Sequence, residues 1–533
     1  MLMSRPSLLT ASMNTTLPHP RQQQKNGTAT LASLLEALTA AEVTGPTNIA
    51  VAKVRFDSRQ VQPGDLFVAI SHPGYHQDGH SFVVDALDRG AVGVVVGRPV
   101  AVPANVARVV VSDPPRALAL LSAAREGWPA SRLGIIGVTG TDGKTTTTTL
   151  IAGALQALGH TPAHISTVSL GTGAAASSNK SRQSTPEAPE IQRLLARATD
   201  HGADYAVIEA TSHGLAQDRL YGTEVDVAVY TNITHEHLDY HGSIEEYVAA
   251  KARLLALQAP TPGLPAKPHP VAKAAVLNGD DAHCAHLRSL AQVPVMTYGI
   301  HQGADVQATS VAYDGLHLTM QVRTPWGSAQ LRPQVVGPFN VANVLAALTT
   351  MGVLKWPLEA AVKAVRQQDG PPGRMEPIEA GQPFTVIVDY AHTPASLDAV
   401  LQALRPLTPG RLIVVFGSAG ERDRAKRPMM GRVAAARADF FVLTDEDPRA
   451  EDRGRILADI AAGADDAGAH QGTHFLCCPD RRSAIRLAIE RAEPGDTVLL
   501  AGKGHEQSII TGGHSEPWDD RAVARELLSD HAA

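Results

Sequence analysis

An apolar strand that runs into a glycine-rich loop constrains the fold of this chain more than any other feature. Residues 133–140 read LGIIGVTG, and the run continues as TDGKTT to Thr146. This is close to the pattern GxxxxGK[ST], with one residue more between Gly137 and Gly143. Glycines let successive backbone N–H groups curl around phosphate oxygens, and a following helix adds a favourable dipole. The segment predicts a phosphate-binding loop, with Lys144 at the terminal phosphates and the Thr145 hydroxyl on Mg²⁺.

Two questions about this loop stay open at this point: whether it binds phosphate at all, and to which class of nucleotide-binding protein it belongs. A strand–helix turn that binds nothing would show the same glycines. A phosphate loop also occurs in kinases, GTPases, ATPases and ligases, so the loop alone does not choose among them. The chain has no guanine-specific NKxD signature, which argues against a GTPase.

The composition describes a folded protein without a general attraction to polyanions. Lys and Arg number 47 against 53 Asp and Glu, a net charge of −6, and aromatic residues make up only 4%. We therefore expect no nucleic-acid partner. The three cysteines exclude a disulfide scaffold and fit a reducing compartment. Arginines and prolines interrupt the most apolar long window, residues 91–111, so we expect no membrane insertion and a cytoplasmic protein.

The order of apolar runs and breaks predicts an α/β protein of three domains behind a tail. Residues 1–28 are polar and have no signal-peptide core, which predicts a disordered tail. Residues 29–132 predict a small α/β domain, and residues 133–369 a central phosphate-loop domain with a doubly wound sheet. The run Gly-Pro-Pro-Gly opens residues 370–533, where four apolar strands predict a Rossmann-like domain. Each domain has its own core, so a monomer is expected.

Polar side chains follow the strands next to the loop. Glu209 ends the apolar run DYAVIEA, and His237 follows the run VDVAVYTNI. Side chains at the carboxyl ends of parallel strands converge on a bound nucleotide, and Mg²⁺ prefers oxygen ligands, so Glu209 is a predicted magnesium ligand. His237 by itself favours a structural or solvent-facing role. No cysteine or spaced acidic residue completes a zinc site with His235 and His241.

Lys251 lies in the helical stretch SIEEYVAAKARLLAL. Its position alone predicts a lysine on the surface of a helix.

A series of motifs in order along the chain resembles the Mur ligases. They are VTGTDGKTT (138–146), STPE (184–187), EATSHGL (209–215), TNITHEHLDYHG (231–242) with AAK (249–251), GPFNVANVLAAL (337–348), PPGRME (371–376), VDYAHTP (388–394), FGSAGERDRAKRPMM (416–430), DEDPR (445–449) and AGKGHE (501–506). The phosphate loop is shared with folylpolyglutamate synthetases. The segments DSRxVxPGDLFVA (57–69), HQDG (76–79) and GERDRAKRP resemble the branch that completes the tripeptide of the cell-wall precursor.

The resemblance implies an ATP-dependent ligase that forms an amide bond. A substrate carboxylate would attack the γ-phosphate of ATP, and an amine would then displace phosphate from the acyl phosphate. The implied cofactors are ATP, two Mg²⁺ ions and a CO₂-derived carbamate on Lys251. A carbamate forms only from a neutral amine, so the pKa of this lysine would have to be lowered. The implied metal ligands are Thr145, Glu209, His237 and the carbamate, and the implied catalytic residues are Lys144, Lys251 and His237.

The resemblance also implies binding residues, position by position, for a UDP-sugar in the first domain, ATP in the second and an amino acid in the third. For UDP-N-acetylmuramoyl-L-alanyl-D-glutamate they are Ser58, Ser184, Thr185, Thr211, Gln217 and Arg219. For ATP they are Gly140, Thr141, Asp142, Gly143, Lys144, Thr145, Thr146, Asn340, Arg374, Asp389 and His392. For the incoming diamino acid they are Arg422, Asp447, Arg449, Gly502 and Glu506.

The identity of the diamino acid depends on the motif DEDPR. Members of the family that add meso-diaminopimelate typically read DNPR, and Asp447 stands in place of that Asn. A carboxylate there would attract a distal ammonium and repel a distal carboxylate by about 1 kcal/mol or more, which favours L-lysine or L-ornithine. Arg449 argues the other way, because it could neutralise Asp447 or hold a carboxylate, and meso-diaminopimelate stays open.

Two rival functions also stay open. One is a folylpolyglutamate-type ligase, which a folate substrate would reveal. The other is a non-catalytic nucleotide-binding switch, which Lys144, Glu209, His237 and Lys251 together argue against.

Overall fold

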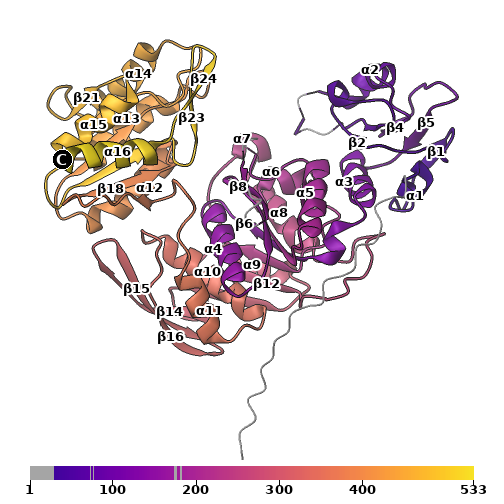
Figure 1. The fold of residues 1–533 in the computed structure, drawn as a ribbon, viewed down its shortest axis with the longest axis horizontal. Coiled ribbons are helices and arrows are strands. Elements are labelled where there is room, and N and C mark those ends of the chain that lie inside the picture. Colours follow the sequence, from indigo (N-terminus) through magenta and orange to yellow (C-terminus); the bar gives the residue numbers. More distant parts are fainter. Residues whose placement is uncertain (1–28, 72–73, 76, 173–176, 180–182, 533) are drawn as a thin grey trace, which may run out of the picture.

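The chain folds into three successive lobes. The computed structural model describes residues 29–532 except 72–73, 76, 173–176 and 180–182, so the tail predicted for residues 1–28 lies outside the described residues. In Figure 1 the indigo N-terminal lobe, the magenta to salmon central lobe and the orange to yellow C-terminal lobe follow one another. Among the described residues, no helix is long and apolar enough to cross a membrane.

The N-terminal lobe is a five-stranded sheet in the order β1-β5-β4-β3-β2, parallel except for β1. The central strands β3 and β4 are buried along their whole length. Alternate residues of β4 face different helices. Val95 packs with α1 and α3, and Val94 packs with α2. The elements are β1 (Glu42–Thr44), β2 (Val54–Arg55), β3 (Leu66–Val68), β4 (Gly93–Val96), β5 (Ala107–Val110), α1 (Leu31–Leu35), α2 (Val83–Asp88) and α3 (Pro114–Arg125).

The central lobe holds a sheet of eleven strands in the order β16-β15-β14-β13-β12-β11-β6-β10-β7-β8-β9. Its strands are β6 (Gly134–Thr139), β7 (Pro162–Ile165), β8 (Ser169–Thr172), β9 (Ser177–Ser178), β10 (Tyr205–Glu209), β11 (Val227–Tyr230), β12 (Ala274–Asn278), β13 (Val295–Gly299), β14 (Val306–Asp314), β15 (His317–Thr324) and β16 (Gly327–Leu331). Its helices are α4 (Lys144–Ala157), α5 (Ala188–Asp200), α6 (Ser212–Ala216), α7 (Leu238–His241), α8 (Ile244–Ala256), α9 (Cys284–Leu290), α10 (Asn340–Val353) and α11 (Leu358–Arg366).

The strand that precedes the phosphate loop, β6, lies between β10 and β11 in the parallel part of this sheet. Glu209, at the end of β10, therefore comes to the same edge as the loop. The predicted doubly wound sheet is confirmed in this parallel part. The antiparallel strands β14 to β16 and β8 to β9 extend it on both sides and were not predicted.

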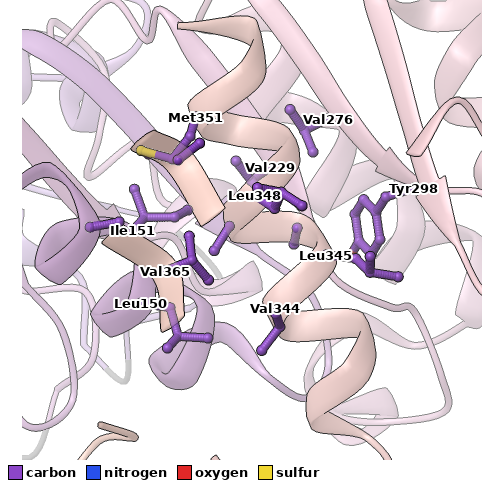
Figure 2. Close-up of a cluster of buried hydrophobic side chains, with 14 of the residues drawn as sticks. Leu150, Ile151, Val229, Val276, Tyr298, Val344, Leu345, Leu348, Met351 and Val365 are labelled. Atoms are coloured by element: carbon purple, nitrogen blue, oxygen red, sulfur yellow. The ribbon is translucent and has the colours of Figure 1, made fainter. Parts of the chain in front are cut away.

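Two hydrophobic clusters cover the two faces of the central sheet. One includes Leu150 of α4, Leu345 of α10 and Val365 of α11 against Val229 of β11, and Figure 2 shows these side chains packed together with Val276 and Tyr298. The other packs α5 and α8 on the opposite face, against residues such as Ile135. Burial on both faces explains why β6 is apolar throughout rather than alternating.

The C-terminal lobe has a six-stranded sheet in the order β17-β18-β22-β19-β20-β21, parallel except for the edge strand β17, and a separate hairpin β23-β24. The four strands predicted from the sequence are all present and parallel. The elements are β17 (Glu376–Pro377), β18 (Thr385–Asp389), β19 (Leu412–Phe416), β20 (Phe440–Leu443), β21 (Phe475–Cys477), β22 (Thr497–Ala501), β23 (Ser508–Thr511), β24 (His514–Pro517), α12 (Pro394–Leu404), α13 (Lys426–Arg437), α14 (Arg453–Asp466), α15 (Arg481–Arg491) and α16 (Asp520–Ala532).

Candidate active site

The glycine-rich loop joins β6 to α4 as the sequence predicts. Gly143 has a left-handed φ of +79°, and a Cβ at this position would collide with the Asn343 amide. The Lys144 ammonium donates to the carbonyl oxygens of Gly140 and Thr141, at 3.0 and 2.6 Å. Since Gly143 has no side chain to cap α4, the first N–H groups of the helix are available to phosphate oxygens beside this ammonium.

The segment after β11 supports the loop. The backbone N–H of Thr141 donates to the Asn232 carbonyl at 2.7 Å, and that of Asp142 donates to the Asn232 side-chain oxygen at 2.9 Å. The Thr231 hydroxyl donates to the Asp142 carbonyl at 2.6 Å. Thr146, the last of the predicted loop residues, is buried in the first turn of α4. Thr231 and Asn232 were not predicted as loop partners, although they follow β11 at the edge where such partners would lie.

Thr145 and Glu209 come together beside the loop. The buried Glu209 carboxylate accepts hydrogen bonds from the Thr145 hydroxyl at 3.2 Å and from the Thr167 hydroxyl at 3.0 Å. It also accepts from the backbone N–H of Thr167 at 3.0 Å. A hydroxyl and a carboxylate oxygen are the hard donors that Mg²⁺ prefers, so these residues fit the ion that the sequence predicts. Thr167 was not predicted, because it stands outside the motifs and only the fold brings it here.

The interpretation of Lys251 as a surface residue is wrong. Its side chain is 1% exposed on α8, and its Nζ donates to the Gly140 carbonyl at 2.6 Å. The same Nζ lies 4.4 Å from the centre of the Tyr247 ring. Burial, together with the nearby charge of Lys144, holds the pKa of Lys251 well below its usual value. This environment favours the neutral amine that carbamate formation requires.

His237 lies apart from these hydrogen bonds, in a group of aromatic rings. It precedes α7 with a left-handed φ of +55°, its side chain is 45% exposed, and its ring centre is 4.8 Å from that of His213. His213 also faces Tyr240 and His241. Within the described parts of the chain, no three His, Cys, Asp or Glu side chains form a metal-binding group. The structure thus places the His237 ring beside that of His213. His213 was not predicted from the sequence as a site residue.

Three predicted substrate residues lie around Glu209. The buried Thr185 hydroxyl donates to the Glu209 carbonyl at 2.7 Å and accepts from the backbone N–H and the hydroxyl of Thr211, at 2.9 and 3.0 Å. The Ser184 hydroxyl is 2.6 Å from that of Thr167. Hydroxyl groups from two loops are therefore collected at the carboxyl end of β10, where a substrate carboxylate would approach the phosphate loop.

Gln217 and Arg219 face the N-terminal lobe. The Arg219 guanidinium donates to the Gln217 side-chain oxygen at 2.6 Å and pairs with the Glu187 carboxylate at 2.7 Å. Gln217 itself donates to the Gly74 carbonyl at 3.4 Å. The Tyr75 hydroxyl of the same N-terminal loop donates to Glu187 at 2.8 Å. Glu187 and Tyr75 were not predicted as site residues. No sequence pattern distinguishes either residue from its neighbours as part of a site.

A cavity of about 280 Å³ opens between the N-terminal and central lobes. Its lining includes Arg55 and Asp57 from one lobe and Glu187 and Arg193 from the other. Ser58, the predicted uridine contact, is buried directly after Asp57. The predicted residues Ser58, Ser184 and Thr185 are sequence neighbours of lining residues and are not themselves part of the lining.

The four predicted nucleotide contacts beyond the loop fall into two groups. Asn340 is buried at the start of α10 and accepts from the Asn343 amide at 2.7 Å, which links it to the phosphate loop. Arg374, Asp389 and His392 gather around Tyr390 in the C-terminal lobe, with the Arg374 guanidinium 4.6 Å from the ring centre. Burial raises the pKa of Asp389 and lowers the pKa of His392.

The predicted amino-acid residues lie mostly at the carboxyl ends of β20 and β22. The fully buried Lys503 ammonium donates to Asp447 at 2.9 Å and to Glu506 at 2.6 Å. Asp447 also accepts from the backbone N–H of Ile510 at 3.1 Å. Lys503 was not predicted, and its charge offsets the negative charge on which the interpretation of Asp447 depended.

Glu446 was also missed, although it precedes Asp447 in the DEDPR motif. Its carboxylate is buried beside Gly502, with one oxygen that has no hydrogen-bond partner, and burial raises its pKa to about 7. The Arg449 Nε is likewise buried without a partner, whereas Arg422 is exposed on the loop before α13. Buried polar groups are nearly always paired, so unpaired ones on converging loops indicate a place for a ligand.

Comparison with known proteins identifies the family. Residues 50–126 match the catalytic domain of the Mur ligase family, residues 138–351 the Mur ligase middle domain and residues 373–504 the Mur ligase glutamate ligase domain. A UDP-N-acetylmuramyl-tripeptide synthetase of Roseiflexus sp. is 50% identical over 494 residues, which cover 91% of this chain and 96% of that protein. The chain belongs to the Mur ligase family. As a Mur ligase it is an ATP-dependent enzyme that forms amide bonds, and the predicted fold class is confirmed.

Further relatives of this Mur ligase carry a more specific name. A UDP-N-acetylmuramoyl-L-alanyl-D-glutamate–2,6-diaminopimelate ligase of Geobacillus thermodenitrificans is 41% identical, with coverage of 94% of this chain and 99% of that protein. A solved structure of a ligase with the same name has a TM-score of 0.68 at 32% identity and covers 94% of this chain and 99% of the other. A solved MurF structure from Acinetobacter baumannii, 22% identical with a TM-score of 0.59 and coverage of 94% and 98%, shares the fold.

Proposed function

We propose that this Mur ligase adds a diamino acid to UDP-N-acetylmuramoyl-L-alanyl-D-glutamate, a step of peptidoglycan precursor synthesis and so of cell-wall growth and division. The supporting observation is that relatives named for tripeptide synthesis or for addition of 2,6-diaminopimelate match 91% and 94% of the chain. We assign the UDP-sugar to residues 29–132, ATP to residues 133–369 and the amino acid to residues 370–533. A cytoplasmic monomer completes the proposal.

The central lobe supplies what phosphoryl transfer needs. The D-glutamate carboxylate attacks the γ-phosphorus of ATP, its bond to phosphorus forms as the bond to ADP breaks, and an acyl phosphate results. This step depends on positioning and charge neutralisation rather than on covalent help from the protein. The Lys144 ammonium and the first N–H groups of α4 face the phosphates, and the hydrogen-bonded Thr185 and Thr211 shape the place that the carboxylate approaches.

The carboxylate and hydroxyl oxygens beside the loop would hold magnesium. Thr145 and Glu209 are the proposed ligands, and His237 and a carbamylated Lys251 are proposed as further ligands. Bound Mg²⁺ neutralises charge on the phosphate oxygens. Loss of the Thr145–Glu209 contact is therefore expected to weaken nucleotide binding rather than the fold.

Lys251 is proposed to carry the carbamate. Its neutral Nζ attacks the carbon of CO₂, a nitrogen–carbon bond forms, one proton leaves, and the residue becomes an anion. Burial beside the Gly140 carbonyl supports the neutral amine. Intact-mass measurement after rapid trapping of the carbamate would detect the added group, and K251M would not carry it.

In the second step the amine of the diamino acid attacks the acyl carbon, and phosphate leaves from the tetrahedral intermediate. We propose that the acceptor carries a distal ammonium without a distal carboxylate beside it, as L-lysine and L-ornithine do, since a carboxylate in the pocket attracts the first group and repels the second. The unpartnered Glu446 oxygen supports this choice better than Asp447, because Lys503 already pairs with Asp447. Arg449 lies on the same loops and could hold a distal carboxylate. Use of meso-diaminopimelate is therefore the outcome that would contradict this choice.

The test is release of phosphate from ATP by the purified chain with each component omitted in turn. Release is expected only when both UDP-N-acetylmuramoyl-L-alanyl-D-glutamate and a diamino acid are present. Release without the acceptor, or with a folate and glutamate instead, would contradict the proposal. E209Q serves as the inactive control, and an exposed carboxylate exchange, E490Q, is the matched control that retains activity.

A further inference from the structure

A fully buried arginine outside every motif connects the two strands that carry the amino-acid loops. Arg481 begins α15, and its side chain is 1% exposed. Its guanidinium donates to the carbonyl oxygens of Asp445 and Ala501, each at 3.0 Å. Asp445 follows β20 and Ala501 ends β22, and these strands are not neighbours in the sheet, because β19 lies between them.

The two carbonyl groups stand directly before the residues that face the proposed ligand. Asp445 precedes Glu446, and Ala501 precedes Gly502, beside which the Glu446 carboxylate lies. The guanidinium therefore connects two strand ends that no ladder hydrogen bond joins. The planar fork of arginine reaches two carbonyl oxygens at once, which a lysine ammonium on a flexible stem does not reproduce.

The C-terminal helix holds this guanidinium in place. Asp520, the first residue of α16, accepts from Arg481 Nε and Nη2 at 2.8 and 2.6 Å. The Trp518 indole N–H donates to the same carboxylate at 2.8 Å. Arg481 also lies at the start of α15, where the helix dipole disfavours a cation, so the paired carboxylate offsets both that field and the cost of burial.

We propose that Arg481, held by Asp520, is a positioning residue for diamino-acid binding, and that α16 thereby sets the spacing between Glu446 and Gly502. The inference rests on the proposed function, since it assigns the gap between these loops to the incoming amino acid. It predicts selectivity. Disturbing Arg481 changes recognition of the amino acid and leaves recognition of the UDP-muramoyl dipeptide unchanged, because that substrate meets the other two lobes.

The test compares KM values in the full-length chain. R481K retains a cation next to Asp520 but loses the fork, so the KM for the preferred diamino acid is expected to rise about tenfold, the scale of a misplaced binding group. The KM for the UDP-muramoyl dipeptide should stay as it is. D520N, which keeps Arg481, should raise the KM for the diamino acid selectively but to a smaller extent. D520N replaces R481K as the test variant if R481K does not fold.

D496N is the matched control. Asp496 is a buried partner of Arg411, at 2.8 Å, at the opposite end of the same sheet. It should lower the melting temperature without changing the KM for the amino acid. Folded R481K or D520N with an unchanged KM for the amino acid, and only a lower kcat or melting temperature, would overturn the inference alone. If the unsubstituted chain shows no acceptor-dependent phosphate release, the proposed function fails and this inference fails with it.

Discussion

The phosphate loop and the proposed amino-acid pocket, formed by the loops that follow β20 and β22, are built in opposite ways. At the phosphate loop, Lys144, Thr145, Glu209 and Lys251 all have hydrogen-bond partners within the protein. In the amino-acid pocket, Glu446 keeps a buried oxygen without a partner. The first site is hydrogen-bonded within the protein before its ligand arrives, whereas the second presents a buried carboxyl oxygen without a hydrogen-bond partner.

This difference indicates where each kind of recognition originates. A phosphate is bound by main-chain N–H groups and one ammonium, which a short local sequence can supply. In the proposed function, a diamino acid is selected by the balance of charges from several loops. The residues that contribute these charges are Glu446, Asp447, Lys503, Glu506 and Arg449.

Removal of the Lys144 charge should have the largest effect. K144M leaves the γ-phosphate without its ammonium, and we expect kcat to fall by at least about 10³-fold, the scale set by a cation on a transferring phosphoryl group. Single-turnover phosphate release measures it. K363M, on the exposed side of α11, is the control that should keep full activity. A K144M enzyme within about tenfold of the unsubstituted one would contradict this role.

Neutralising Glu446 should shift the choice of acceptor. E446Q removes the unpaired carboxylate, and the KM for L-lysine or L-ornithine should rise about tenfold, which is about 1.4 kcal/mol. D447N should have a smaller effect, because Lys503 already pairs with Asp447. Steady-state kinetics with each acceptor measure the two effects on KM. A larger effect of D447N than of E446Q would show that Asp447 is the residue that distinguishes the acceptors.

The raised pKa of Glu446, about 7, predicts a pH dependence. The carboxylate attracts a distal ammonium only when ionised, so the KM for L-lysine should fall as the pH rises through about 7, and E446Q should lack this change. The stability has the corresponding sign. The raised pKa contributes stability that is fully present below the unfolded pKa, near 4.5, and is lost as the pH rises through 7. Parallel pH profiles of E446Q and the unsubstituted chain that coincide would refute the assignment.

The smallest effect is expected at Thr211, whose hydroxyl caps α6 by accepting from the Gly214 N–H at 3.1 Å. T211A should reduce the free energy of unfolding by about 1 kcal/mol, and T211S, which keeps the hydroxyl, by less than about 0.5 kcal/mol. Urea titration measures both. Equal losses for the two variants would show that the methyl group, not the cap, matters here.

Local patterns predicted the strands and the loop because each depends on neighbouring residues. The buried strand, the glycines and the Gly-Lys-Thr run specify β6 and the start of α4 without help from distant parts of the chain. The antiparallel strands β14 to β16 were missed. The pattern of apolar runs in residues 133–369 already fitted a parallel sheet, to which these strands are an extension.

Contacts between distant segments could not be predicted in this way. The helical spacing around Lys251 resembles a surface helix, and only the packing of α8 under the loop buries this lysine against Gly140, 111 residues away. The pairing of Lys503 with Asp447 joins two loops 56 residues apart. The resemblance to the Mur ligases supplied the importance of Lys251, but the charge balance of the amino-acid pocket required the fold.

Competition among acceptors tests the central claim most directly. The purified chain receives ATP, UDP-N-acetylmuramoyl-L-alanyl-D-glutamate and equal concentrations of L-lysine, L-ornithine and meso-diaminopimelate, and mass spectrometry identifies the tripeptide formed. We expect the product to contain L-lysine or L-ornithine, and the E446Q variant to lose that preference. A product that contains mainly meso-diaminopimelate would contradict the assignment of Glu446 as a carboxylate that attracts the distal ammonium and repels a distal carboxylate.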